Sequence, residues 1–319
     1  MRITQEKLKE ILASHGKWLR CENGGERADL SNANLCSANL GGADLCYANL
    51  RNADLSNADL SYANLRYANL GGADLCYANL RNADLSNADL SYANLRYANL
   101  GNANLGGADL GNANLCGADL GNADLGYANL RNANLGGADL GNTDLGNANL
   151  GNANLGGADL GNADLGNANL CSANLGGADL CYANLRNANL RYANLGNANL
   201  GGADLSNANF SNADLRVVDL CDANLCDANL SGASLSKTYY QIVRIGSRNA
   251  TTTYCVEDDN VVCGCWNDYK GGTLAEFKKR VESVYDKNGE SPNKKYYGQY
   301  MAAIEFFEKM AKLAKMEEG

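Results

Sequence analysis

Aspartate is the side chain with the clearest chemical potential in this 319-residue sequence, because it recurs at a fixed spacing. Between residues 119 and 179 the aspartates form two series with a twenty-residue interval. The first series is Asp119, Asp139, Asp159 and Asp179, and the second is Asp124, Asp144 and Asp164. Acid–base catalysis needs two titratable groups in different environments. A regular series without histidine or glutamate offers none, so the sequence predicts fixed surface charge rather than catalysis.

A five-residue repeat positions these aspartates. Leucine returns at every fifth position through residues 28–237, replaced only by Phe210, and nearly all of the 42 pentapeptides read Ala-(Asp/Asn)-Leu-X-X. A period of five fits neither the 3.6-residue period of a helix nor the two-residue period of a strand, so the chain must turn every five residues. Alternation then places alanine and leucine inside and Asp or Asn outside, while the last two residues form a corner.

The corner residues indicate the turn type. Glycine or asparagine usually stands second in the corner and suits the positive φ that a type II turn requires there. Corners such as Cys46-Tyr47 are expected to use a different turn.

The repeat resembles the pentapeptide repeat family over 210 of the 319 residues. The resemblance implies an all-β solenoid, a right-handed quadrilateral parallel β-helix with four pentapeptides per coil. On that basis the array makes about 10.5 coils and a rod roughly 50 Å long. We expect a helical N-terminal cap at residues 1–27, the β-helix at 28–237 and a small α+β C-terminal capping and interaction domain at 238–319.

With four pentapeptides per coil, the two aspartate series become vertical columns on adjacent faces, and the other two faces carry only asparagine there. Carboxylates stacked ~4.8 Å apart repel one another, and a costly arrangement indicates function. The alternative is that the acid only confers solubility. Residues 41–70 recur unchanged at 71–100, which supports this alternative. Thirty residues make one and a half coils, so each copied residue falls on the opposite face. This part of the rod therefore cannot preserve a face-specific surface.

The family resemblance also implies a function. Some pentapeptide repeat proteins mimic DNA, bind DNA gyrase in its place and dimerise through a C-terminal helix. We therefore expect a non-enzymatic binding protein of bacterial or phage type, with a topoisomerase such as DNA gyrase as partner. The sequence departs from these members in having no loop between coils and a larger C-terminal region. The alternative is a structural or adaptor solenoid whose C-terminal domain recognises the partner.

Several partners and ligands are not expected. The net charge of −9 argues against direct nucleic-acid binding, which needs clustered lysine and arginine. Residues 1–19 have charges throughout, so they form neither a secretion signal nor a membrane span. No cofactor, catalytic residue or metal ligand is predicted.

Cysteine placement favours a reducing environment. Eight of the twelve cysteines stand first in a corner, and no two of these are twenty residues apart, so they form no ladder of vertical neighbours. Free thiols without a secretion signal favour the cytoplasm. Cys255, Cys263 and Cys265 could bind zinc, but no fourth ligand with finger-like spacing follows, and the favoured interpretation is small apolar strand residues.

The N-terminal residues predict a helix that covers the first coil. Thr4 can cap it, and an apolar stripe at helical spacing includes Leu8 and Leu12. His15, the only histidine, lies on this stripe and is expected to be a packed residue.

After residue 237 the repeat stops. Strands are expected at 239–245, 251–257 and 261–266, followed by a helix capped by Thr273 and a final helix at about 294–315. One stripe of the final helix, with Ile304 and Phe307, is expected to cover the last coil. A second stripe is left for a partner or a homodimer, and its residues are Phe306, Met310 and Leu313.

Overall fold

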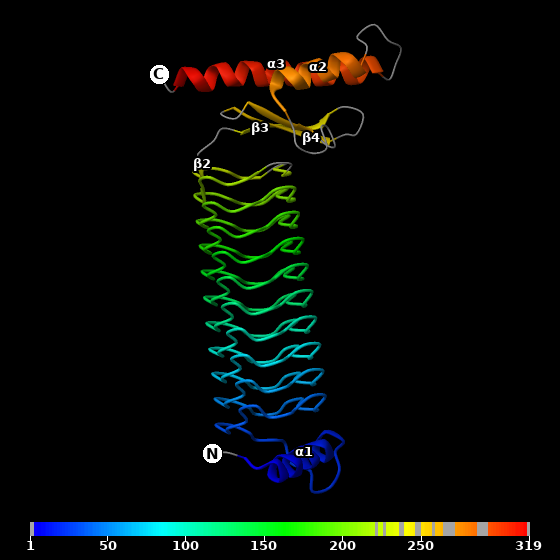
Figure 1. Cartoon of the computed structure of the whole chain (residues 1–319), viewed down its shortest axis with the longest axis vertical. Helices are drawn as coiled ribbons and strands as arrows, with labels where there is room; N and C mark the ends of the chain where they lie inside the picture. Colours follow the sequence, from blue (N-terminus) through cyan, green and yellow to red (C-terminus); the bar gives the residue numbers. More distant parts are fainter. Residues whose placement is uncertain are drawn as a thin grey trace.

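The computed structural model describes residues 3–220, 223–225, 228–235, 239–245, 250–256, 259–263, 272–285 and 293–317. Figure 1 shows a straight stack of coils with helix α1 (Gln5–Leu19) below it and a small domain above it. The last coils contain the short strands β1 (Asp214–Leu215) and β2 (Ser234–Leu235). The upper domain has strands β3 (Tyr239–Ile245), β4 (Ala250–Cys255) and β5 (Asn260–Cys263) and helices α2 (Leu274–Val284) and α3 (Asn293–Glu317).

The repeat closes one coil every twenty residues. Parallel bridges join each outward Asp or Asn to the residue twenty positions later, from Asp29–Asn49 to Asn209–Asn229. From Leu30 to Leu205 each leucine N–H donates to a carbonyl of the next coil, as in Leu140 to Asp159 at 2.7 Å, and from Asn49 onward the outward residues donate to the coil below. Four pentapeptides therefore make each coil, and residues twenty apart are vertical neighbours.

Leucine and alanine fill the interior of the rod. Leucines from Leu45 to Leu205 are completely buried, and Phe210 takes the place of one of them with 0% exposure. Thr143 replaces an alanine, and its buried hydroxyl donates to the carbonyl of Leu120 at 3.0 Å, which satisfies the one polar group that the substitution brings inside.

Corners with tyrosine in the second position adopt the same left-handed conformation as corners with asparagine there. The expectation of a different turn at Cys46-Tyr47 is therefore wrong. Tyr47 has φ 62°, close to the 56° of Asn142. A left-handed tyrosine costs roughly 1–2 kcal/mol. Closure of the coil offsets this cost, because Tyr47 N–H donates to the carbonyl of Arg66 at 2.8 Å and its ring stacks on Tyr67 with centroids 4.9 Å apart.

Helix α1 covers the first coil. Thr4 caps the helix by accepting from Lys7 N–H, and the buried Leu8 joins the core of the rod together with the partly buried Ile3 and Leu12. After the helix the chain doubles back at Gly25, where a Cβ would lie 2.2 Å from the backbone nitrogen of Trp18. Only glycine allows this approach.

The C-terminal domain has a core of its own. Strands β3, β4 and β5 form an antiparallel sheet in that order, and α2 begins at Thr273 with a capping box completed by Glu276. The elements lie close to the predicted ranges. Their shared core contains aromatic and aliphatic residues from the sheet and both helices, namely Tyr254, Val256, Val261, Leu274, Phe277, Val281, Tyr300, Ala303, Ile304 and Phe307.

The packing of α3 differs from the expectation. Figure 1 shows the sheet between the last coil and the two helices, so the stripe with Ile304 and Phe307 covers the sheet and α2 rather than the coil. The sheet face and α2 offer this stripe apolar partners on two sides.

The two ends of the rod also differ, because Leu235 in the last coil is 39% exposed whereas Leu30 above α1 is 1% exposed.

Candidate protein-binding site

The predicted aspartate series form two vertical stacks, which we call the acidic columns. The first column contains Asp119, Asp139, Asp159 and Asp179, and the second contains Asp124, Asp144 and Asp164. Parallel bridges link each member directly to the next, and all seven side chains are exposed. The columns lie on adjacent faces, five residues apart along the chain.

Each column aspartate also starts a corner. Its Oδ1 accepts from the backbone N–H two residues later, as Asp139 does from Gly141 at 2.9 Å. Asparagine performs the same task on the neighbouring face, where Asn154 Oδ1 accepts from Gly156 N–H at 3.2 Å. The turn therefore needs an oxygen acceptor but no charge, and the fold does not explain the choice of aspartate.

Asparagine would even add a hydrogen bond. On the face with asparagine only, Asn174 Nδ2 donates to Asn154 Oδ1 at 2.9 Å, and Asn154 donates to Asn134 at the same distance. A carboxylate above another carboxylate has no proton to donate. The acidic columns therefore forgo this ladder and stack like charges instead.

Replacing Asp159 with asparagine should therefore stabilise the rod. The new amide can donate to Asp139, as Asn129 donates to Asp109 at 2.8 Å, so we expect the free energy of unfolding to rise by up to about 1 kcal/mol. Urea denaturation measures the change. The reverse substitution Asn154→Asp is the matched control and should destabilise the rod, and a loss of stability in Asp159→Asn would contradict the assigned cost.

No arginine stands at the position from which it could pair with a column aspartate. Elsewhere an arginine eighteen residues earlier approaches the aspartate, as in Arg66–Asp84 at 3.8 Å and Arg186–Asp204 at 3.9 Å. For every column aspartate that position is a glycine: Gly101, Gly106, Gly121, Gly126, Gly141, Gly146 or Gly161. Across the described residues, none of the seven carboxylates forms an ion pair.

Stacked glycines of these corners also line a groove beside each column. The first groove has a volume of about 450 Å³ and is lined by Asp139, Asp159 and Asp179, by stacked glycines and by asparagines of the corner. The second, of about 340 Å³, is lined by Asp144 and Asp164 and, at its upper end, by Arg186, which forms its ion pair with Asp204. In other coils the first corner position is occupied by larger residues such as Cys181 and Arg186. The backbone therefore does not require glycine at this position, and glycine leaves space beside the aspartates.

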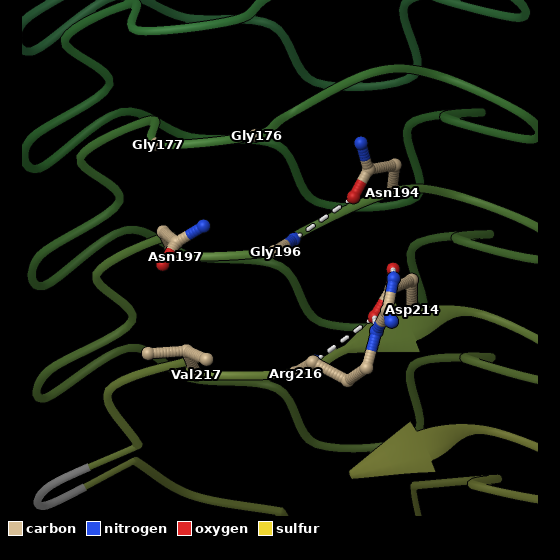
Figure 2. A pocket seen from close by; sticks show the side chains of 8 residues that line it. All are labelled: Gly176, Gly177, Asn194, Gly196, Asn197, Asp214, Arg216 and Val217. Atoms are coloured by element: carbon tan, nitrogen blue, oxygen red, sulfur yellow. Dashed lines mark hydrogen bonds and ion pairs between the residues drawn. The ribbon is translucent and has the colours of Figure 1, made fainter. Parts of the chain in front are cut away.

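A larger groove lies higher on the face that carries Asn154 and Asn174, and it lacks this unpaired charge. Figure 2 shows it, with a volume of about 670 Å³. Asn194 accepts from Gly196 N–H, and Arg216 forms two side-chain hydrogen bonds to Asp214 at 2.8 and 2.6 Å. These bonds lower the pKa of Asp214 below its usual value. The one carboxylate that lines this groove is therefore ionised and paired with an arginine, whereas the column carboxylates are unpaired.

The remaining predicted residues lie apart from the columns. Phe306 is 40% exposed and Met310 half-buried on α3, and Leu313 lies in α3 with a side chain outside the described set. Cys255 is buried on β4.

The other two C-terminal cysteines add little to the zinc alternative. Cys263 ends β5 opposite Thr252, and Cys265 lies outside the described residues. Within the described ranges there is no group of three metal-ligating side chains and no helix long and apolar enough to cross a membrane. The seven described cysteines between residues 21 and 181 are free.

A twenty-residue coil with leucine inside and Asp or Asn outside defines a class of β-solenoid, and the sequence comparison names it. This chain belongs to the pentapeptide repeat family, because the pattern described as pentapeptide repeats matches eight copies between residues 26 and 239. The predicted family and repeat solenoid are thereby confirmed.

Solved structures of the same family are similar to this chain. HetL, a protein involved in heterocyst differentiation regulation in the cyanobacterium Nostoc, is 39% identical over 69% of this chain and 96% of its own, with a TM-score of 0.49. QnrB1, a plasmid-mediated fluoroquinolone resistance protein, is 20% identical over 66% of this chain and 90% of its own, with a TM-score of 0.30. A search of curated proteins finds no match.

Proposed function

We propose that this protein is a non-enzymatic binding protein whose acidic columns mimic DNA and bind a topoisomerase such as DNA gyrase. The observation that carries the proposal is the set of seven exposed carboxylates that form no ion pair in the described structure. The topoisomerase is taken from the family resemblance, in which some members bind DNA gyrase. Such a partner, and the free cysteines, favour a cytoplasmic location.

The charge density of the columns approaches that of DNA. Strand spacing puts one carboxylate per ~4.8 Å in each column, so two columns give one charge per roughly 2.4 Å of rod axis. Duplex DNA carries one charge per about 1.7 Å. A basic groove that binds DNA would attract such a surface, and the attraction would weaken with salt.

The middle of the rod contains little positive charge that could offset the charge of the acidic columns. Residues 101–180 contain eight aspartates, one arginine and neither lysine nor glutamate. Bulky corner residues such as Tyr67 and Tyr97 concentrate toward the N-terminal end, and the middle corners are mainly glycine and asparagine. The charge is therefore displayed on a narrow and smooth segment of the rod.

Gyrase supercoiling tests the proposal. The wild-type protein should inhibit the reaction, and a column variant with Asp139, Asp144, Asp159 and Asp164 changed to Asn should lose most of the inhibition. The control variant changes Asp54, Asp74, Asp89 and Asp109 to Asn, which removes the same charge from two stacked pairs elsewhere. The control should still inhibit. Equal inhibition by both variants, or none by the wild type, would refute the role of the columns.

A twofold dimer through α3 would lengthen the acidic surface. The helices form the outer layer of the domain at the end of the rod (Figure 1), and Phe306 is 40% exposed there. Pairing of this layer would place two rods end to end. Sedimentation should show a wild-type dimer that the double change Phe306→Glu and Leu313→Glu converts to a monomer. A wild-type monomer would remove the dimer from the proposal.

One observation favours a second function. The C-terminal domain has a core separate from that of the rod, so an adaptor whose C-terminal domain recognises the partner is the alternative. Deleting residues 238–319 distinguishes the two. The adaptor would lose all partner binding, whereas a DNA mimic would keep a weakened, salt-sensitive inhibition by the columns.

A further inference from the structure

Helix α1 is fastened to the first coil by a histidine that can serve only while it is neutral. We propose that α1 is a pH-released lid: protonation of His15 breaks its hydrogen bond to Ala28 and frees the helix from the rod. This inference concerns the N-terminal end of the rod and is independent of the proposed function of the acidic columns.

The hydrogen bond fixes the state of the imidazole. His15 is completely buried, and its Nδ1 accepts from the backbone N–H of Ala28 at 3.1 Å. An acceptor nitrogen carries no proton, so the neutral ring holds its single proton on Nε2. Ala28 is the first alanine of the repeat, and the bond therefore ties α1 to the point where the first coil begins.

Protonation turns this contact from favourable to unfavourable. A proton on Nδ1 would face the Ala28 N–H, and two donors would be left buried without an acceptor. The buried Nε2 makes no hydrogen bond of normal geometry among the described residues, and the influence of Asp44 and of the Cys46 backbone, which favours the cation, is smaller than the cost of burial. Among the described residues, the other hydrogen bonds from the lid to the coil and its lead-in include Glu26 N–H to Ser14 Oγ at 3.1 Å and Ile3 N–H to the carbonyl of Asn34 at 3.5 Å.

The surroundings of His15 act in both directions. Burial lowers the pKa of His15 below its usual value of 6.5, and the positive charge of Arg27 adds to the lowering. Asp44 and the backbone of Cys46, both in the first coil, raise the pKa and oppose this effect in part. On α1 itself, the ring of Trp18 stacks on His15 with centroids 5.6 Å apart and also favours the cation. Burial prevails.

Because burial outweighs the groups that raise the pKa of His15, the direction of the pH effect is determined. A group whose pKa is lower in the closed lid than in the open lid stabilises closure above its ordinary pKa and loses that contribution as the pH falls. The closed lid should therefore be favoured above pH 6.5. Below that value, the population of open lid should rise by up to tenfold per pH unit until the pKa of the closed state is reached.

The test uses the fact that the chain has a single histidine. Nuclear magnetic resonance of the one imidazole in the full-length protein gives its pKa directly. Hydrogen exchange of residues 5–19, corrected for the intrinsic rate at each pH, gives the opening of the lid between pH 8 and pH 5. Residues 101–180 in the same sample serve as the internal reference for the intact rod.

His15→Gln provides the matched variant, because its amide oxygen can accept from Ala28 and does not titrate. We expect a wild-type pKa below 6.5 and lid protection that falls with pH in the wild type but not in His15→Gln, while the rod stays protected in both. A pKa at or above 6.5 would overturn the proposal. So would lid protection that does not depend on pH in the wild type, or that falls equally in His15→Gln.

Discussion

Replacing Leu140 with alanine should lower the free energy of unfolding by about 2–5 kcal/mol, one of the two largest effects we expect from a change in this chain. Leu140 has 0% exposure in the middle of the rod, with coils above and below it. Neighbouring coils are held by hydrogen bonds at short distances and cannot collapse into the cavity. Urea or thermal denaturation measures the loss.

The control for Leu140 lies two residues away. Asn142 is exposed at the corner with φ 56°, a value that glycine adopts without cost, so Asn142→Gly should be nearly silent. The contrast tests the inside and outside positions of the repeat. Similar losses from Leu140→Ala and Asn142→Gly would contradict the assignment of leucine to the interior.

Deletion of residues 1–19 should cause end-to-end association or aggregation rather than unfolding of the rod. The truncated chain would expose the lower strand edges of the first coil together with Leu30 and Leu35, which are 1% and 3% exposed under the lid. Unpaired strand edges are templates for pairing with another chain. Coils farther up contact only their neighbours, so they should remain folded.

Analytical ultracentrifugation, with circular dichroism for the fold, measures the effect of this deletion. The full-length chain is the control. A truncated protein that keeps the spectrum of the rod and the sedimentation behaviour of the full-length chain at high concentration would show that α1 does not protect the end of the rod.

The rod could be predicted from the sequence because one short period determines it. A leucine every five residues excludes helix and strand, and twenty-residue neighbours follow once four pentapeptides make a coil. The corner at Tyr47 was mispredicted because local preference disfavours a left-handed tyrosine. The hydrogen bond to Arg66 and the ring of Tyr67, both one coil away, decide its conformation.

The C-terminal elements could be predicted, but their packing could not. The apolar stripe on α3 shows that the helix buries one face and does not show which surface it meets. Ile304 and Phe307 pack in the core formed with the sheet and α2 because these offer apolar side chains, and the sheet separates them from the coil.

The acidic columns were visible in the sequence, and the grooves beside them were not. The twenty-residue spacing placed Asp139 above Asp119. The sequence also shows that no arginine stands on either acidic face between residues 119 and 179. The contact of Arg66 with Asp84 adds which position must be glycine to leave an aspartate unpaired. The groove beside the first column depends on Gly121 and Gly141 in the same way.

The most direct test of the central claim is displacement of a labelled DNA duplex from DNA gyrase, followed by fluorescence anisotropy as the protein is added. Wild-type protein and the control variant with Asp54, Asp74, Asp89 and Asp109 changed to Asn should both displace the duplex, less effectively as salt is raised. The column variant, with Asp139, Asp144, Asp159 and Asp164 changed to Asn, should fail to do so. Failure of the wild type to displace DNA, or equal displacement by the two variants, would contradict the claim that the acidic columns take the place of DNA.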